Sequence, residues 1–280
     1  MAYLLKQAYN NYFYLMNEVS DPRSKELWIA ASPVPILVLV YVWYQFVLSW
    51  GPKFMENRRP LEIKPLMIVY NIVQVMGNAY ILYYLFLSIN EIDWSCAEID
   101  FSEDYWPKMH FKLTYLYFLI KILDLMDTIF FVLRKKSAHI SFLHVYHHAM
   151  MVIVGWVALK YLGGGHSYFL GLANCSVHII LYLYYLLTAY DSKFGQIIWI
   201  KKFITQMQLT QFAFLFWSYT KLLFKPDCNY PLLAVYLLIP QNCFMVILFS
   251  DFYIRTYILA PRRKKLLEEA QQNNEKDIQS

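Results

Sequence analysis

The sequence predicts an all-α integral membrane protein with seven transmembrane helices, and two observations support this fold class. Of the 280 residues, 59% are hydrophobic and only 16% are charged, whereas a soluble domain is nearer half apolar and a quarter charged. The apolar residues also form runs of the roughly 20 residues that a helix needs to cross a bilayer. The net charge of +5 comes from short basic patches beside these runs. We interpret these patches as a topology signal rather than as a nucleic-acid-binding surface.

Seven apolar runs meet the length requirement, and prolines at or near several of their ends fit residues that cannot continue a helix. The expected spans are Ser32–Ser49, Leu66–Ser88, Phe111–Leu133, Ser141–Leu162, Ser167–Thr188, Phe203–Leu223 and Leu232–Leu259. Pro240 lies inside the seventh span and predicts a kink. The short Gly163-Gly164-Gly165 linker predicts that spans four and five are antiparallel neighbours. An inverted repeat of spans two to four in spans five to seven is compatible with the sequence, which does not demonstrate it.

The basic residues predict the orientation. Most of them collect in loops on one side: Lys53, Arg58, Arg59, Lys64, Arg134, Lys135, Lys136, Lys193, Lys201, Lys202 and 262–265. The positive-inside rule makes this side cytosolic. We therefore expect an N-terminal lumenal segment (1–28), a seven-helix domain (29–260) and a basic, then disordered, cytosolic tail (261–280).

Two of the four cysteines lie in loops on the opposite side. Cys96 falls between spans two and three, and Cys228 between spans six and seven. Cysteines that face an oxidising compartment pair readily, so we expect a Cys96–Cys228 disulfide. Two free thiols are the alternative.

Polar side chains inside the expected spans are arranged in stripes. His144, His147 and His148 share one face of span four, because offsets of three and four residues do so on a helix. Similar stripes lie on spans three (Lys121, Asp124, Asp127, Thr128), five (Asn174, His178, Tyr182, Tyr185) and six (Thr205, Gln208, Gln211). Intramembrane ionisable residues indicate a functional site by default. The alternative is a set of interhelical hydrogen bonds that hold the bundle together.

The stripes are expected at similar depths. At ~1.5 Å per residue, Asp127 and His147 each lie about 9 Å from the cytosolic end of their span, and His178 lies about 14 Å deep. The segments beyond them, toward the lumen, are apolar. The pattern predicts a polar chamber above an apolar pocket, suited to a ligand with a hydrophilic head and a long alkyl tail.

The His-x-x-His-His spacing first suggests a metal, because clustered histidines bind metals. Membrane di-iron desaturases and hydroxylases use about eight such histidines, whereas only His144, His147, His148 and His178 lie in the expected chamber. A di-iron centre is therefore not expected, although a single zinc or iron stays an alternative. Metal-free acyl chemistry is the prediction, since imidazole can act as a base or attack a thioester.

These motifs resemble those of the fatty acid elongases of the endoplasmic reticulum, the very-long-chain 3-oxoacyl-CoA synthases. The Lys-x-x-Glu-x-x-Asp-Thr motif occurs at 121–128 with Asp124 in place of glutamate, and the histidine box is complete at 144–148. The Asn-x-x-x-His-x-x-Met-Tyr-x-Tyr-Tyr motif occurs at 174–185 with Leu181 in place of methionine, and Thr-x-x-Gln-x-x-Gln is complete at 205–211. The resemblance runs from about residue 25 to 260.

The resemblance implies a reaction and its surroundings. Malonyl-CoA would condense with a long- or very-long-chain acyl-CoA, with loss of CO2 and CoA, to give a 3-oxoacyl-CoA two carbons longer. Spans two to seven would enclose a narrow substrate tunnel, without a cofactor or metal. Membrane lipid, the reductase, dehydratase and enoyl reductase of the elongation cycle, and a second copy in a homodimer are the expected partners.

The roles expected from the residues and the resemblance fall into two groups. The catalytic group is His144, His147, His148, His178, Asp127, Asn174 and Gln208. The substrate-binding group is Lys121, Asp124, Tyr182, Tyr185, Gln211, Arg134, Lys135 and Lys136. We expect His147 to be nucleophile or base, Asp127 to orient a histidine, and Asn174, Gln208 and His178 to stabilise an oxyanion.

Two other functions compete with this hypothesis. One is a seven-helix lipid-binding receptor or transporter. The other is an elongase-like protein with weakened catalysis, for which Asp124 in place of glutamate is the only indication.

Overall fold

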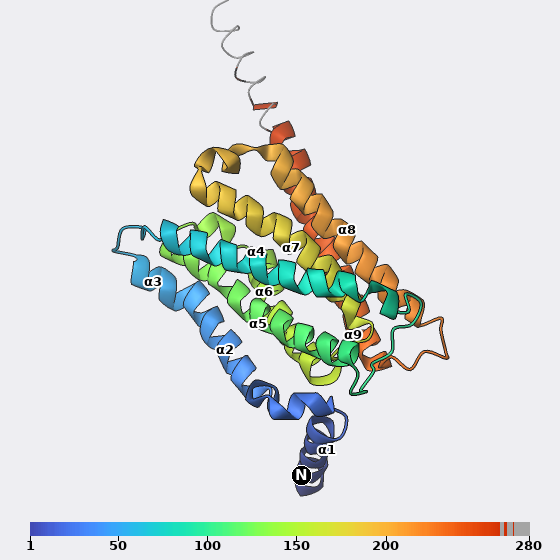
Figure 1. Ribbon diagram of the computed structural model, residues 1–280. Coiled ribbons are helices and arrows are strands. Elements are labelled where there is room, and N and C mark those ends of the chain that lie inside the picture. The colour runs from blue at the N-terminus through green and yellow to red at the C-terminus, as the bar shows by residue number, and fades with distance from the viewer. Residues whose placement is uncertain (264–265, 268–270, 272–280) are drawn as a thin grey trace, which may run out of the picture.

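The computed structural model describes residues 1–263, 266, 267 and 271, and within them the secondary structure is helical without a strand (Figure 1). The α-helices are α1 (Ala2–Asn17), α2 (Val34–Gln45), α3 (Gly51–Met55), α4 (Lys64–Leu87), α5 (Tyr105–Leu133), α6 (Phe142–Tyr161), α7 (Ser167–Tyr190), α8 (Ile198–Leu222) and α9 (Leu232–Tyr253). The all-α prediction is confirmed for this part of the chain. Most of the tail predicted to be disordered (261–280) lies outside the described residues.

The protein is a multi-pass membrane protein. Among the described residues, five helical segments are long and apolar enough to cross a bilayer: Val34–Met55, Lys64–Leu87, Phe142–Tyr161, Ser167–Tyr190 and Leu232–Arg263. The first segment joins α2 to α3 through a π-helical turn, Phe46–Trp50. Helices α5 and α8 have 29 and 25 residues and would also reach across a membrane, but α5 carries more charge and α8 contains more uncharged polar residues. The count of seven spans therefore stays a prediction.

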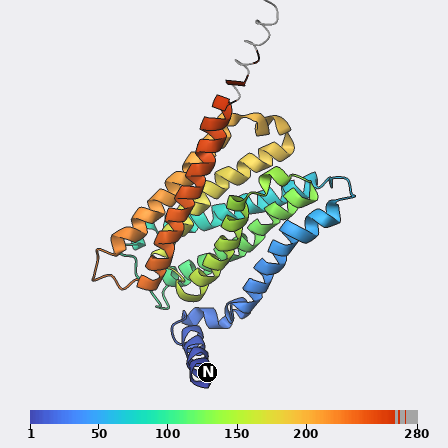
Figure 2. The ribbon, with the colours of Figure 1, turned by 180° about the vertical axis from the view of Figure 1, so that it is seen from behind.

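Six helices pack in a closed ring. In order around the ring, α4, α5, α6, α9, α8 and α7 each pack against the next, and α7 packs along α4 to close it. Helix α2 lies at the margin of the bundle, against α6, in both views (Figures 1 and 2). Exchanging α4–α6 with α7–α9 leaves this pairing unchanged, which is the pattern that an internal two-fold repeat produces.

The prediction that spans four and five are close neighbours is wrong. Helix α6 packs mainly along α5, and α7 packs mainly along α4, although only residues 162–166 join α6 to α7. The linker can turn sharply because Gly164 and Gly165 have φ values of +132° and +56°, which glycine adopts without a steric penalty. A short connection therefore does not decide which helices pack together.

The two ends of the ring differ in character. The basic end consists of the loops 56–63, 134–141 and 191–197. The disulfide end consists of loops 88–104 and 223–231, linker 162–166 and segment 18–33. There Cys96 is bonded to Cys228, with 5.8 Å between their Cα atoms. Arg23 donates hydrogen bonds to Asp21 and to the carbonyl oxygens of Pro107 and Gly163, so the N-terminal segment is tied to this end.

Candidate active site

A buried ion network lies between α5 and α7. Lys121 on α5 is 0% exposed, and its Nζ donates to Asp124 Oδ2 at 2.8 Å and to His178 Nδ1 at 3.3 Å. A charge buried in this way needs a partner, because desolvation of an unpaired ammonium is very costly. Since the ammonium donates to Nδ1, the ring proton of neutral His178 lies on Nε2. The network therefore presents an imidazole N–H donor.

The hydroxyl of Tyr182 joins the two acidic residues of α5. Its Oη lies 2.9 Å from Asp124 Oδ1 and 2.8 Å from Asp127 Oδ2. Tyr182 has one phenolic proton and can donate it to only one of these two carboxylate oxygens at a time. Asp127 was predicted to orient a histidine, but its hydrogen-bond partner is Tyr182. The residue of α5 that contacts His144 is Thr128.

Helix α4 supplies two further members of the network that sequence reasoning missed. Gln74 Nε2 donates to Asp124 Oδ1 at 2.7 Å and to Tyr70 Oη at 3.0 Å, and Tyr70 Oη lies 3.3 Å from Tyr182 Oη. Tyr70 and Gln74 are four residues apart inside the apolar run Leu66–Ser88. This is the same stripe spacing that indicated the other helices, so the signal was present in the sequence.

The histidine box is held beside this network by the next residue of α5. Thr128 Oγ1 lies 2.9 Å from His144 Nε2. The His144 and His148 rings are 4.3 Å apart, and the His147 and His148 rings are 5.6 Å apart, between centroids. Within the described part of the chain, neither His147 nor His148 has a side-chain hydrogen bond to another residue. Their ring nitrogens are therefore available to a ligand.

Four other predicted site residues of α7 and α8 have contacts outside the hydrogen bonds of this network. Asn174 Oδ1 accepts from Tyr117 Oη at 3.0 Å, an arrangement that leaves the amide hydrogens of Asn174 for another partner. The Tyr185 ring packs edge-on against Tyr182. Gln211 is buried and its Oε1 has no partner in the part of the chain that the structure describes, whereas Gln208 is partly exposed.

The basic residues after α5 do not join the network. Arg134 contacts Met67 Sδ at 3.3 Å, Lys135 Nζ donates to the carbonyl oxygen of Glu56 at 3.0 Å, and Lys136 is exposed. They remain at the basic end of the ring, where a charged headgroup could meet them.

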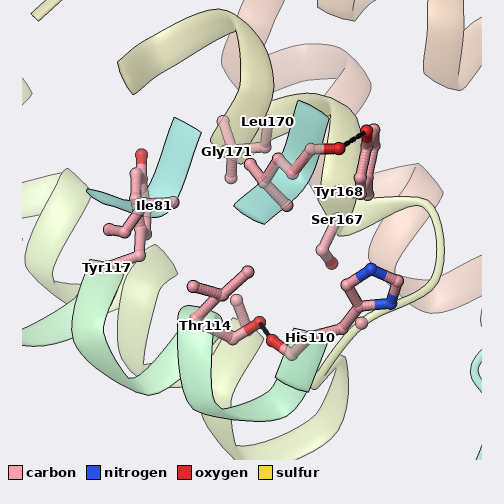
Figure 3. Close-up of a pocket in the computed structure, with 12 residues that line it drawn as sticks. Ile81, His110, Thr114, Tyr117, Ser167, Tyr168, Leu170 and Gly171 are labelled. Atoms are coloured by element: carbon pink, nitrogen blue, oxygen red, sulfur yellow. Dashed lines mark hydrogen bonds between the residues drawn. The ribbon is translucent and has the colours of Figure 1, made fainter. Parts of the chain in front are cut away.

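An apolar cavity lies between the network and the disulfide end. Figure 3 shows the residues that line it. It is lined from α4, α5 and α7 by residues that include Ile81, Leu113, Thr114, Tyr117 and Tyr168. His110 and Ser167 lie at its side toward linker 162–166. This is the position expected for an apolar pocket, but the cavity is small, and a continuous tunnel stays a prediction.

Comparison with known proteins identifies the family. The GNS1/SUR4 family model matches residues 28–265. The chain belongs to this family. A very long chain fatty acid elongase of Aedes aegypti is 36% identical over 273 residues, which are 96% of this chain and 76% of that protein.

Vertebrate relatives agree with the insect one. Very long chain fatty acid elongase 7 of Rattus norvegicus is 35% identical over 89% of this chain and 90% of its own length. Very long chain fatty acid elongase 1 of Mus musculus is 34% identical over 95% of this chain and 96% of its own length. The resemblance drawn from the motifs is confirmed, and this membership supports an enzyme of fatty acid elongation.

Proposed function

We propose that this GNS1/SUR4 protein is the condensing enzyme of fatty acid elongation. It joins malonyl-CoA to a long- or very-long-chain acyl-CoA. The observation that carries the proposal is that α5 contacts both His178 on α7, through the buried network, and the histidine box on α6. Consecutive residues of α5, Asp127 and Thr128, contact the Lys121–Asp124–His178 network through Tyr182 and the histidine box through His144.

The first half-reaction uses a free ring nitrogen. His147 attacks the thioester carbonyl carbon of acyl-CoA, the C–S bond breaks, and the thiolate of CoA leaves and takes up a proton. Thr128 orients His144, which packs on His148 beside the nucleophile. Phe212 and Phe249 flank His147, with ring centroids 6.1 Å away, and keep water from this side of the ring.

The second half-reaction forms the new carbon–carbon bond. Malonyl-CoA loses its carboxylate as CO2, and the electron pair of the broken bond forms an enolate. The enolate carbon attacks the acyl carbonyl and displaces His147, which gives a 3-oxoacyl-CoA two carbons longer. The net reaction consumes one proton. The Nε2–H of His178 and the amide of Asn174 donate to the developing oxyanion, as preorganised donors do.

The apolar cavity on one side of the site and the basic residues on the other side position the two parts of the substrate. The acyl tail extends toward the apolar cavity between α4, α5 and α7, and the CoA phosphates lie toward Arg134, Lys135 and Lys136 at the basic end. Arginine and lysine suit phosphate oxygens because of their charge and multiple donors. The product then requires a reductase, a dehydratase and an enoyl reductase to become a saturated acyl-CoA.

We further propose that the protein resides in the endoplasmic reticulum membrane, with its N-terminus lumenal and its C-terminus cytosolic. The Cys96–Cys228 bond supports a disulfide end that faces an oxidising lumen. The basic loops at the other end support a cytosolic face.

One assay tests the proposed function. The purified protein in detergent is given acyl-CoA of several chain lengths with malonyl-CoA labelled at its methylene carbon. A labelled 3-oxoacyl-CoA two carbons longer is expected, with unlabelled CO2 released. The absence of product at every chain length would favour a lipid-binding or catalytically weakened protein. If chelators abolish product formation and added zinc or iron restores it, the metal-free scheme is wrong.

A further inference from the structure

Asp124 departs from the elongase motif, in which a glutamate stands at this position. Its carboxylate is one methylene closer to the backbone of α5 than the carboxylate of a glutamate would be. Nevertheless both oxygens are partnered: Oδ2 accepts from Lys121, and Oδ1 accepts from Tyr182 and Gln74. The bond from Gln74 is 2.7 Å long, the shortest of the three.

Gln74 is held in a single orientation. Its side chain is 0% exposed, and its two amide hydrogens serve Asp124 Oδ1 and Tyr70 Oη. Tyr70 in turn lies 3.3 Å from Tyr182. Gln74 Oε1 is buried and has no hydrogen-bond partner among the described residues, so the two bonds from Nε2 alone orient the amide. Turning the amide over would bring Oε1 against the carboxylate of Asp124 and remove both donated bonds, which is costly in a low-dielectric interior.

We propose that Gln74 is a positioning residue for the condensation reaction and that it compensates for the short carboxylate of Asp124. Its amide occupies the space on the α4 side into which a glutamate at position 124 would extend. It thereby holds the aspartate against Lys121. This inference rests on the proposed function and adds to it a residue outside the four motifs.

The effect of Gln74 reaches the chemistry through two further contacts. Asp124 accepts from Lys121 at 2.8 Å, and Lys121 donates to His178 Nδ1 at 3.3 Å. If the carboxylate moves, the ammonium moves with it, and His178 loses the bond that places its proton on Nε2. The turnover number and its pH dependence should therefore change, whereas the Michaelis constants should not.

Asn78 provides a matched control for a merely structural amide. It lies one turn further along α4 and is also 0% exposed, but its Nδ2 donates to the backbone carbonyl of Gln74 at 2.8 Å rather than to Asp124. Loss of this bond disturbs α4 itself and leaves the carboxylate of Asp124 fully bonded.

The kinetic test compares Gln74→Met with Asn78→Leu in the condensation assay. Gln74→Met keeps the side-chain length and removes the donor to a charged group, so kcat is expected to fall about 10- to 100-fold. Both KM values should stay within about threefold, and the pH profile of kcat should shift. Asn78→Leu should keep kcat within about threefold and leave the profile unchanged. If Gln74→Met also retains kcat and pH profile, the inference is overturned.

The second test asks whether Gln74 and Asp124 are coupled. Asp124→Glu should lower kcat because the extra methylene overfills the site beside Gln74. Adding Gln74→Ala should restore kcat at least about fivefold over Asp124→Glu alone, by making room for the longer side chain. Effects that simply multiply in the double variant would contradict the compensation.

The same variants separate this inference from the proposed function. Failure of the wild-type protein to make any 3-oxoacyl-CoA counts against the proposed function. The double-variant cycle is then read from the thermal unfolding midpoint, which needs no activity. A coupling indistinguishable from zero there overturns the Gln74–Asp124 pairing, and a favourable one supports it. Should Gln74→Met not fold, Gln74→Asn withdraws the amide by one methylene and is expected to give a smaller loss of kcat.

Discussion

The histidines at the two ends of the helix ring have different surroundings. At the disulfide end, His110 and His166 each lie 2.9 Å from a serine hydroxyl, those of Ser88 and Ser218. In the histidine box, His147 and His148 have ring nitrogens without a side-chain partner among the described residues. The first pair resembles ordinary core histidines, whereas the second pair is open to a ligand.

The other contacts of the two regions follow the same division. The disulfide end is held by a covalent bond and by Arg23 on backbone carbonyls, which fix the chain without forming a chemical site. The region around α5 is held by hydrogen bonds between buried side chains, among them Lys121, Asp124 and Tyr182. Substitutions in the two regions should therefore separate stability from activity.

The largest expected effect is on catalysis. His147→Ala should lower 3-oxoacyl-CoA formation by at least about 10⁴-fold, because removal of a nucleophile disables the whole catalytic unit. The unfolding midpoint should change little, since the His147 side chain has no hydrogen bond among the described residues to lose. His166→Gln is the control at the disulfide end and should retain activity. If His147→Ala keeps near-normal incorporation of malonyl-CoA while His178→Ala loses it, His147 is not the nucleophile.

The disulfide should dominate stability. The bond links residues 132 positions apart, and the chain-entropy relation assigns a loop of this length about 4–5 kcal/mol. Cys96→Ser with Cys228→Ser should lower the unfolding midpoint strongly, and protein that remains folded should retain its kcat. Cys243→Ser, which removes an exposed free thiol, is the control and should leave the midpoint unchanged. An unchanged midpoint without the bond would show that this end is held by packing alone.

Arg23 should contribute less than the disulfide. Arg23→Met removes hydrogen bonds to Asp21 and to three backbone carbonyls and leaves the buried Asp21 without its counter-ion. The expected loss is about 2–3 kcal/mol. Arg255→Met is the control, since its bond to Asp251 is exposed and such pairs contribute about 0–1 kcal/mol. Equal midpoints for the two variants would mean that the N-terminal segment does not brace the ring.

The smallest expected effect is a pH dependence of stability at the disulfide end. Burial lowers the pKa of His166 from 6.5 to about 4, against the opposing bond to Ser218. The stability that His166 contributes is therefore complete above pH 6.5 and is lost as the pH falls from 6.5 toward 4, because only the unfolded chain takes up the proton. At pH 5 the loss is about 2 kcal/mol.

Unfolding midpoints at pH 7.5 and 5 measure this loss. The wild-type protein should lose more stability between these pH values than His166→Gln, which cannot titrate at this position. If the midpoints of the two proteins fall equally between pH 7.5 and 5, the imidazole of His166 is protonated as easily in the folded protein as in the unfolded chain.

Much of the site was predictable from local spacing. The box at 144–148 and the stripes of α5 and α7 lie together as expected, because residues three or four apart share a helix face whatever surrounds the helix. Gln74 and Tyr70 have the same spacing but stand in a run that otherwise reads as apolar. The spacing of Tyr70 and Gln74 indicates a polar face on α4, but it does not say that this face packs against Asp124.

The sequence by itself determined the helices, their apolar lengths, the polar face of each one and the side on which Cys96 and Cys228 meet. These properties depend on helix period and on the partition of side chains between water and lipid, which act within each segment. Only the tertiary structure decided that α7 packs along α4 rather than α6, that Tyr182 rather than a histidine meets Asp127, and that Gln74 reaches Asp124. Such pairings depend on how the whole ring closes, because the surface of each helix can be buried against several others and the connecting loops are too weak a constraint to choose among them.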